Sequence, residues 1–216
     1  LLPLLLLLLA ETAAGQTVAL LSDINGRYGS TDYSPRVSRA IDGIVRSGAD
    51  VVVATGDMVA GQQQPRLDGP ALDAMWAAFQ DTVAGPLDAA GIPIAISAGN
   101  HDASGFPAFA PEQARFEAWW NERHPGLELL PGSEWPWRYA ARVDKLLLLT
   151  FYGTMPGRLP DGERQFVELV ERVLDGAVVE PVPAAAASTM GRGQVLAVNV
   201  VGPPGRKAGS ASFVTI

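Results

Sequence analysis

The sequence predicts an α/β fold built on a parallel sheet, and two observations lead to this expectation. Three apolar runs, at residues 17–23, 49–57 and 92–100, each end in a small residue followed by a polar one. Segments with helical periodicity lie between these runs. Apolar runs of this kind are typical of strands buried on both faces, and their alternation with helices predicts right-handed parallel crossovers.

The first helix is predicted within "SPRVSRAIDGIVRSG" at residues 34–48, where apolar side chains recur at helical spacing. Ser34 is a candidate N-cap, Pro35 suits the first turn, and Gly48 is a candidate C-cap glycine. A second helical region runs from residue 71 to 90, and we expect Gly85-Pro86 to interrupt it.

After residue 100 the pattern changes. We expect an amphipathic helix at 111–124, a strand pair at 137–143 and 145–153 that turns near Asp144, and another helix at 161–174. A Pro/Ala/Gly-rich loop at 178–193 and two closing strands, at 194–202 and 210–216, follow. Trp135 and Trp137 are interpreted as packing residues rather than as a substrate rim.

The composition describes a globular chain without cysteine. Of its 216 residues, 48% are hydrophobic and 18% are charged, which supports a substantial core. The net charge of −7 argues against a broad nucleic-acid-binding surface. A phosphate-bearing substrate would therefore need local positive charge from arginines or a metal. The absence of cysteine excludes disulfides, zinc–thiolate sites and cysteine nucleophiles.

The first residues resemble the end of a secretory signal. "LLPLLLLLLA" is an apolar run of about ten residues, whereas a bilayer span needs roughly 20. Small residues suited to cleavage after Ala14 follow it. We interpret residues 1–15 as a signal-peptide remnant and residues 16–216 as a single domain, and we predict an exported protein, periplasmic or secreted, without a stable membrane span. A buried strand or helix end is the alternative for the leucine run.

Polar side chains end all three predicted strands. They are Asp23, Asp57 and Asn100, the last followed by His101 and Asp102. In an open α/β sheet, ligands bind beyond the carboxyl ends of the strands, so these groups should meet at one edge. Two adjacent carboxylates repel unless a cation lies between them. Oxygen and imidazole ligands suit Mn, Mg, Fe or Zn, so the pattern predicts a divalent metal site.

The motifs that carry these residues resemble a known family. "SDIN" (22–25), "GDMVAG" (56–61) and "GNHD" (99–102) are similar, in order and spacing, to the first three blocks of the calcineurin-like metallophosphoesterases. The resemblance implies an α/β/β/α sandwich with a two-metal site that hydrolyses small-molecule phosphate esters, either monoesters or diesters. By that resemblance, a metal-bound hydroxide would attack phosphorus in line.

The resemblance also implies residue roles. Asp23 would bind the first metal, Asp57 would bridge both metals, and Asn100 would bind the second through its side-chain oxygen. His101 would be the catalytic residue, stabilising the transition state or protonating the leaving alkoxide. Both Asn100 and His101 would also contact substrate.

Two further candidates, Asn25 and Arg27, follow Asp23, and a third, Asp102, belongs to the third motif. The family usually has Asp-x-His in its first block, but here the third position is Asn25, which either ligates through its amide oxygen or only turns the loop with Gly26. Arg27 either binds substrate phosphate, because its guanidinium offers a bidentate fork, or belongs to an ordinary surface loop. Asp102 either orients His101 or forms a turn.

The second half of the family pattern is not found in this sequence. The family uses about five histidines, whereas this chain contains two, His101 and His124, and only His101 stands in a motif. We infer a truncation or internal deletion near residues 175–190, which leaves the second sheet incomplete. The remaining oxygen ligands suit one hard ion rather than a tight metal pair. Activity is then impaired, and the alternative is a non-catalytic remnant that binds a metal or another ligand.

Overall fold

The computed structural model describes residues 16–123, 125–144, 146–154, 165–166 and 197–200. The predicted signal remnant at 1–15, His124, the predicted deletion near 175–190 and the last strand lie outside these residues. So does the helix at 161–174, apart from residues 165 and 166. Within the described ranges, no helix combines the length and the apolar character that a bilayer span requires.

The first sheet contains three parallel strands, as predicted. They are β1 (Val18–Leu21), β2 (Val51–Ala54) and β3 (Ile94–Ile96), in the order β1-β2-β3. Val18 is in register with Val51, and Val52 is in register with Ile94. All three strands therefore end at the same edge of the sheet.

Strand β1 is less buried than expected. The side chains of β2 are all buried, whereas β1 has one buried residue and its Leu20 is 40% exposed. Among the described strands, β1 lies at the sheet edge and pairs only with β2. The prediction that all three runs are buried on both faces is wrong for β1, because an apolar run does not reveal which strand lies at the edge.

Helix α1 (Pro35–Ser47) begins and ends where the sequence predicts. The Ser34 hydroxyl accepts a hydrogen bond from the Arg36 N–H at 3.3 Å, and Pro35 opens the first turn. Gly48 adopts the left-handed conformation (φ 64°) that glycine reaches without steric cost. Val37 and Ile41 on the apolar face are buried.

The second helical region is divided differently from the prediction. Helix α2 (Gly69–Phe79) passes into a π-helical turn at Gln80–Ala84 before α3 (Gly85–Ala89) begins. The Gly85 N–H donates to the Gln80 carbonyl, which closes the wide turn. Proline in a helix clashes with the carbonyl four residues before it, and the wider turn just before Pro86 relieves that clash. The chain therefore bends without leaving the helical path.

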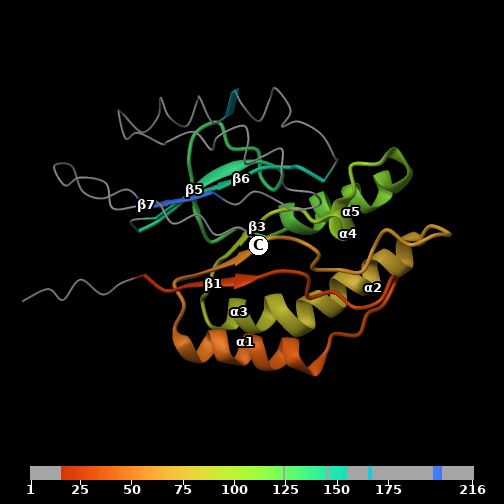
Figure 1. The fold of residues 1–216 in the computed structure, drawn as a ribbon, viewed down its shortest axis with the longest axis horizontal. Coiled ribbons are helices and arrows are strands. Elements are labelled where there is room, and N and C mark those ends of the chain that lie inside the picture. Colours follow the sequence, from red (N-terminus) through yellow and green to blue (C-terminus); the bar gives the residue numbers. More distant parts are fainter. Residues whose placement is uncertain (1–15, 124, 145, 155–164, 167–196, 201–216) are drawn as a thin grey trace, which may run out of the picture.

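A second, antiparallel sheet covers the first. It consists of β4 (Glu128–Leu129), β5 (Tyr139–Val143), β6 (Leu146–Thr150) and β7 (Ala197–Val200), in that order. The expected strand pair turning near Asp144 is β5 and β6. Figure 1 shows α1 and α3 on one side of the β1–β3 sheet and β5 and β6 on the other. The mixed α/β class and the small second sheet are as predicted.

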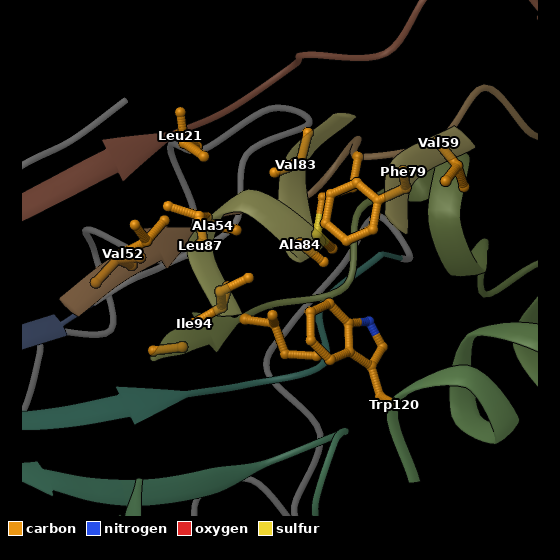
Figure 2. Close-up of a cluster of buried hydrophobic side chains, with 14 of the residues drawn as sticks. Leu21, Val52, Ala54, Val59, Phe79, Val83, Ala84, Leu87, Ile94 and Trp120 are labelled. Atoms are coloured by element: carbon orange, nitrogen blue, oxygen red, sulfur yellow. The ribbon is translucent and has the colours of Figure 1, made fainter. Parts of the chain in front are cut away.

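The main core fills the space around the parallel sheet. Figure 2 shows Phe79, Val83 and Leu87 of the helical segment near Ile94 and Val52 of the strands. From the second sheet, Tyr139, Ala141 and Leu148 join this core. The Tyr139 hydroxyl donates to the Ile96 carbonyl at 2.7 Å and accepts from the Ile96 N–H, so it ties the two sheets together.

The outer face of the second sheet is also buried. Its residues Ala140, Leu147 and Leu149 form a separate cluster with Phe151 and Phe166. Phe166 belongs to the segment predicted as a helix, and residues 165 and 166 are helical. The ring centroids of Phe151 and Phe166 lie 6.4 Å apart.

An aromatic cluster joins α2 to the C-terminal half of the domain. Between α4 (Asn100–Ala103) and β4 lie a short 3₁₀ turn (Pro107–Phe109) and α5 (Ala110–Asn121), which carries part of this cluster. Its members, connected by ring contacts, are Trp76, Phe79, Phe116, Trp119, Trp120, Trp135, Trp137, Tyr139 and Tyr152. The packing role predicted for Trp135 and Trp137 is therefore confirmed.

Candidate functional site

The site lies where the three parallel strands end. The loop after β1 runs beside the loop after β2 and is bonded to it along its length. The Asp23 N–H donates to the Gly56 carbonyl at 3.2 Å, and the Asn25 N–H donates to the Asp57 carbonyl at 3.1 Å. Farther along, Gly29 donates to the carbonyl of Ala60 at 2.6 Å. These bonds bring the first two motifs together as the sequence predicts.

The third motif packs directly against Asp57. The His101 N–H donates to Oδ1 of Asp57 at 3.0 Å. Gly99 lies so close to Asp57 that a Cβ at this position would overlap both the backbone nitrogen and the carboxylate of Asp57. Only glycine allows the loop after β3 to approach this closely, which explains the glycine of "GNHD" in physical terms.

The backbone is strained at both acidic residues. Asp23 and Asp57 have φ angles of 51° and 53°, in the left-handed region that residues with a Cβ rarely occupy. Asp tolerates this conformation better than most residues. Such strain persists only where the surrounding structure imposes it, and it clusters at functional sites.

Asp57 has an unusual electrostatic environment. Burial raises the pKa of its carboxyl, and the nearby Asp23 charge raises it further. Hydrogen bonds from the His101 and Asn100 backbone and the charge of His101 act in the opposite direction. A bound cation would relieve both the burial penalty and the repulsion from Asp23.

The amide side chain of Asn100 is held in one orientation. Its Nδ2 donates to Oε1 of Gln62 at 3.0 Å, so its Oδ1 is the atom left to act as a ligand. With the two carboxylates, this gives an oxygen-rich donor set that suits a hard divalent ion. The described residues contain no group of three His, Cys, Asp or Glu side chains placed to hold a metal.

The imidazole of His101 is oriented by a backbone carbonyl. Its Nδ1 lies 2.9 Å from the Gly61 oxygen. Because a carbonyl only accepts hydrogen bonds, Nδ1 must carry a proton, and Nε2 is the nitrogen left for other partners. The exposed ring of Tyr28 lies beside it, with the ring centroids 5.0 Å apart.

Asp102 does not orient the His101 ring. Its carboxylate is buried and accepts hydrogen bonds from the backbone N–H groups of Met58, Val59 and Gly99, at 2.7, 2.9 and 2.9 Å. It therefore fastens the second motif to the third and acts on loop geometry. Burial, with the neighbouring Asp57 charge, raises the pKa of Asp102 to about 7, although its three N–H partners favour the charged form.

The structure does not decide between the two roles predicted for Asn25 or between those predicted for Arg27. The Asn25 Nδ2 donates to the Val59 carbonyl at 3.3 Å, which helps to hold the loop and leaves Oδ1 for another partner. Arg27 is exposed on the same loop. Among the described residues, no partner engages its guanidinium, so it is available to an anion.

Two residues that hold the site were missed by the sequence analysis. Gln62 follows the second motif and bonds to Asn100, while Glu112 on α5 accepts a hydrogen bond from the Gln62 N–H at 2.9 Å. No sequence pattern singles out Glu112, because it lies 50 residues from its partner. For Gln62, the only signal in the sequence was its position, since it is a polar residue directly after the second motif.

Comparison with known proteins agrees with this geometry. The profile of the calcineurin-like phosphoesterases matches residues 16–178. The chain belongs to this family. A comparison with curated proteins found no match. Calcineurin-like phosphoesterases are metal-dependent hydrolases of phosphate esters, so the family and the oxygen-rich strand ends point to the same class of chemistry.

Proposed function

We propose that this calcineurin-like phosphoesterase is a metal-dependent hydrolase of small-molecule phosphate monoesters or diesters. The observation that supports this most is the meeting of Asp23, Asp57 and Asn100 at one sheet edge, with the His101 backbone bonded to Asp57. Two adjacent carboxylates repel each other, and a cation bound between them would remove that repulsion.

Asp23, Asp57 and Oδ1 of Asn100 would hold the ion, with Asn25 as a further oxygen ligand. The bound ion would supply positive charge to the phosphate oxygens and lower the pKa of water. Oxygen donors favour Mg or Mn over Zn or Fe. Asp57 stays charged when the ion is present, because the ion offsets both its burial and the repulsion from Asp23.

The chain's own residues would position the phosphate and supply a proton. In the charged imidazole of His101, Nδ1–H remains bonded to the Gly61 carbonyl while Nε2–H is free to donate. That proton goes to the leaving oxygen of the ester, which departs as an alcohol. The Arg27 guanidinium provides a cation for the remaining phosphate oxygens.

A non-catalytic protein of the same fold is the second candidate. Only two histidines are present in the chain, and no three-residue group of acidic or histidine side chains appears in the described residues. A site with one ion binds a phosphate without stabilising both the attacking and the leaving oxygen. In that case, ligand binding persists and turnover does not.

Titration calorimetry with Mn²⁺, combined with turnover of an aryl phosphate monoester and a diaryl phosphate diester, separates the two candidates. We expect Mn²⁺ to bind and hydrolysis to depend on it, and the His101→Gln variant should keep the ion and lose turnover. Binding of Mn²⁺ without turnover of either ester would favour the non-catalytic candidate. If the chain binds no Mn²⁺, the proposed hydrolase is wrong, and the candidate left is a non-catalytic remnant that binds another ligand.

A further inference from the structure

We propose that Gln62 and Glu112 are positioning residues of this site: Glu112 fixes the Gly61–Gln62 peptide, whose carbonyl orients the His101 ring, and the side-chain amide of Gln62 orients the Asn100 amide. The inference rests on the proposed function, because it concerns how the same site is held in order. Neither residue is in a motif that predicted the site, and Glu112 comes from a different helix, α5.

One peptide group connects Glu112 to His101. The N–H of the Gly61–Gln62 peptide donates to Oε1 of Glu112 at 2.9 Å. The carbonyl of the same peptide accepts from Nδ1 of His101 at 2.9 Å. Because the peptide is planar, rotating it to break one bond also breaks the other. The carboxylate of Glu112 therefore fixes the orientation of the carbonyl that selects the His101 tautomer.

The side chain of Gln62 makes the second connection. Its Nε2 donates to the Ser104 hydroxyl at 3.0 Å, and its Oε1 accepts from Nδ2 of Asn100 at 3.0 Å. These two bonds orient the Gln62 amide, and the Gln62 amide orients the Asn100 amide. An amide ligates a hard cation only through oxygen, so this orientation decides whether Asn100 is a ligand at all.

The backbone of Gln62 is held in an unfavourable conformation to make these contacts. Its φ angle is 66°, in the left-handed region. The adjacent Gly61 has no room for a side chain, because a Cβ there would overlap the His101 carbonyl and lie 3.0 Å from Oε2 of Glu112. A non-glycine residue in this conformation, beside an obligatory glycine, is typical of a loop whose geometry serves a site.

Burying the carboxylate of Glu112 costs free energy. Glu112 is 4% exposed, and among the described residues its Oε2 has no hydrogen-bond partner. An apolar side chain at this position of α5 would avoid that cost. A role for Oε1 in holding the Gln62 N–H explains why a carboxylate is buried at this position. The charge of this carboxylate also lies near the imidazole of His101.

The Gln62→Gly variant tests the link to Asn100 without unfolding the loop. Glycine accepts the left-handed backbone without strain and keeps the N–H bond to Glu112, so the loop should keep its path although the two side-chain hydrogen bonds of Gln62 are lost. Loss of the side-chain amide should weaken Mn²⁺ binding about tenfold, as losses of such supporting contacts do. Asp144→Gly is the matched control, since Asp144 also has a positive φ (48°) but lies in the β5–β6 turn. The proposal is overturned if Gln62→Gly binds Mn²⁺ as tightly as Asp144→Gly.

A second measurement tests the link to His101 without metal or turnover. Nitrogen-15 NMR of the imidazole rings, taken where they are neutral, reports which nitrogen carries the proton. The parent and Glu112→Gln, whose amide oxygen still accepts from Gln62, should show the Nδ1–H tautomer at His101. Glu112→Ala should lose this preference, and Glu117→Gln on the exposed face of α5 should keep it.

These readouts separate the inference from the proposed function. If the parent chain binds no Mn²⁺, the proposed function fails, while the tautomer still tests whether Glu112 positions His101. If folded Glu112→Ala keeps the Nδ1–H tautomer, Glu112 has only a packing role. If Glu112→Ala does not fold, Glu112→Leu, which fills the same space without an acceptor, replaces it in the tautomer measurement, and the result for Gln62→Gly still decides the link to Asn100.

Discussion

The loops of the site and the aromatic cluster lie in the same domain but contribute to stability in opposite ways. At the site, Asp23, Asp57 and Gln62 have left-handed backbones, and the carboxylates of Asp57 and Asp102 are held where burial raises their pKa. In the aromatic cluster, the rings carried by α2 and α5 pack edge to face or stacked, as aromatic side chains prefer. The site therefore contains groups that cost stability, and the aromatic cluster contains groups that supply it.

This difference predicts how the two regions respond to mutation. Changes in the aromatic cluster should lower the free energy of unfolding and leave the affinity of the folded protein for metal unchanged. Changes at the proposed ligands Asp23, Asp57 and Asn100 should lower the affinity for metal and leave the free energy of unfolding unchanged or raise it. A variant that alters both quantities by similar amounts would show that the separation is wrong.

Trp76→Ala should have the largest effect on stability. Trp76 is 3% exposed, and its ring contacts Phe79, Phe116, Trp119 and Trp120. Removing a buried indole leaves a cavity, so we expect a loss of about 3–5 kcal/mol in chemical denaturation. Metal affinity, measured below the denaturation midpoint, should not change. A loss of affinity in the folded variant would contradict the separation.

Asp57→Asn should have the largest effect at the site. The Asn oxygen still accepts from the His101 N–H, and the variant no longer buries a charge beside Asp23. We therefore expect equal or greater stability without metal, with Mn²⁺ affinity lower by about 100-fold or more, because losing a ligand should cost at least as much as losing a group that only supports one. Asp42→Asn, on the exposed surface of α1, should alter neither quantity.

The stability of the metal-free protein should depend on pH through Asp102. Its pKa is raised from 3.8 to about 7, so the folded state binds a proton more tightly than the unfolded state between these values. By linkage, the free energy of unfolding should fall as pH rises through this window. Urea denaturation at pH 5 and pH 8 measures this. Asp102→Asn should be less stable, but its free energy of unfolding should change less between pH 5 and pH 8. An unchanged pH dependence in this variant would show that groups other than Asp102 cause it.

Arg123→Ala should have the smallest effect. The guanidinium carbon of Arg123 lies 3.3 Å from the centroid of the Trp119 ring, at the edge of the aromatic cluster. Because Arg123 is half-buried, we expect a loss of about 1 kcal/mol in thermal or chemical denaturation. The guanidinium also donates to the Trp119 carbonyl at 3.1 Å and to Oε1 of Gln80, so the loss reports the ring contact and these bonds together. Arg39→Ala on the exposed side of α1 is the control, and an equal loss there would show that neither contributes.

The sequence predicts the parts of this molecule that local rules govern. Ser34, Pro35 and Gly48 mark α1 because caps act within one turn, and Asp23, Asp57 and Asn100 mark the sheet edge because parallel strands end together. The exposure of β1 and the π-helical turn before Pro86 depend on neighbours and packing, which periodicity does not encode.

The supporting residues of the site are hard to predict for a similar reason. Gln62 matters because its backbone is left-handed, and Glu112 matters because α5 passes behind the loop after β2. Asp102 was expected either to orient His101 or to form a turn. Its bond with the Gly99 N–H closes the local turn, but its bonds with the Met58 and Val59 N–H groups, 44 and 43 residues away, were not predicted. Such roles follow from the packing of loops, and no single motif records them.

The most direct test of this account is a crystal structure of the chain grown with Mn²⁺, using anomalous diffraction at the manganese edge. The account predicts an anomalous peak within ligand distance of Asp23, Asp57 and Oδ1 of Asn100, with Asn100 still donating to Gln62. An ion bound elsewhere, or side chains of Asp23 and Asp57 that turn apart with no peak between them, would contradict it.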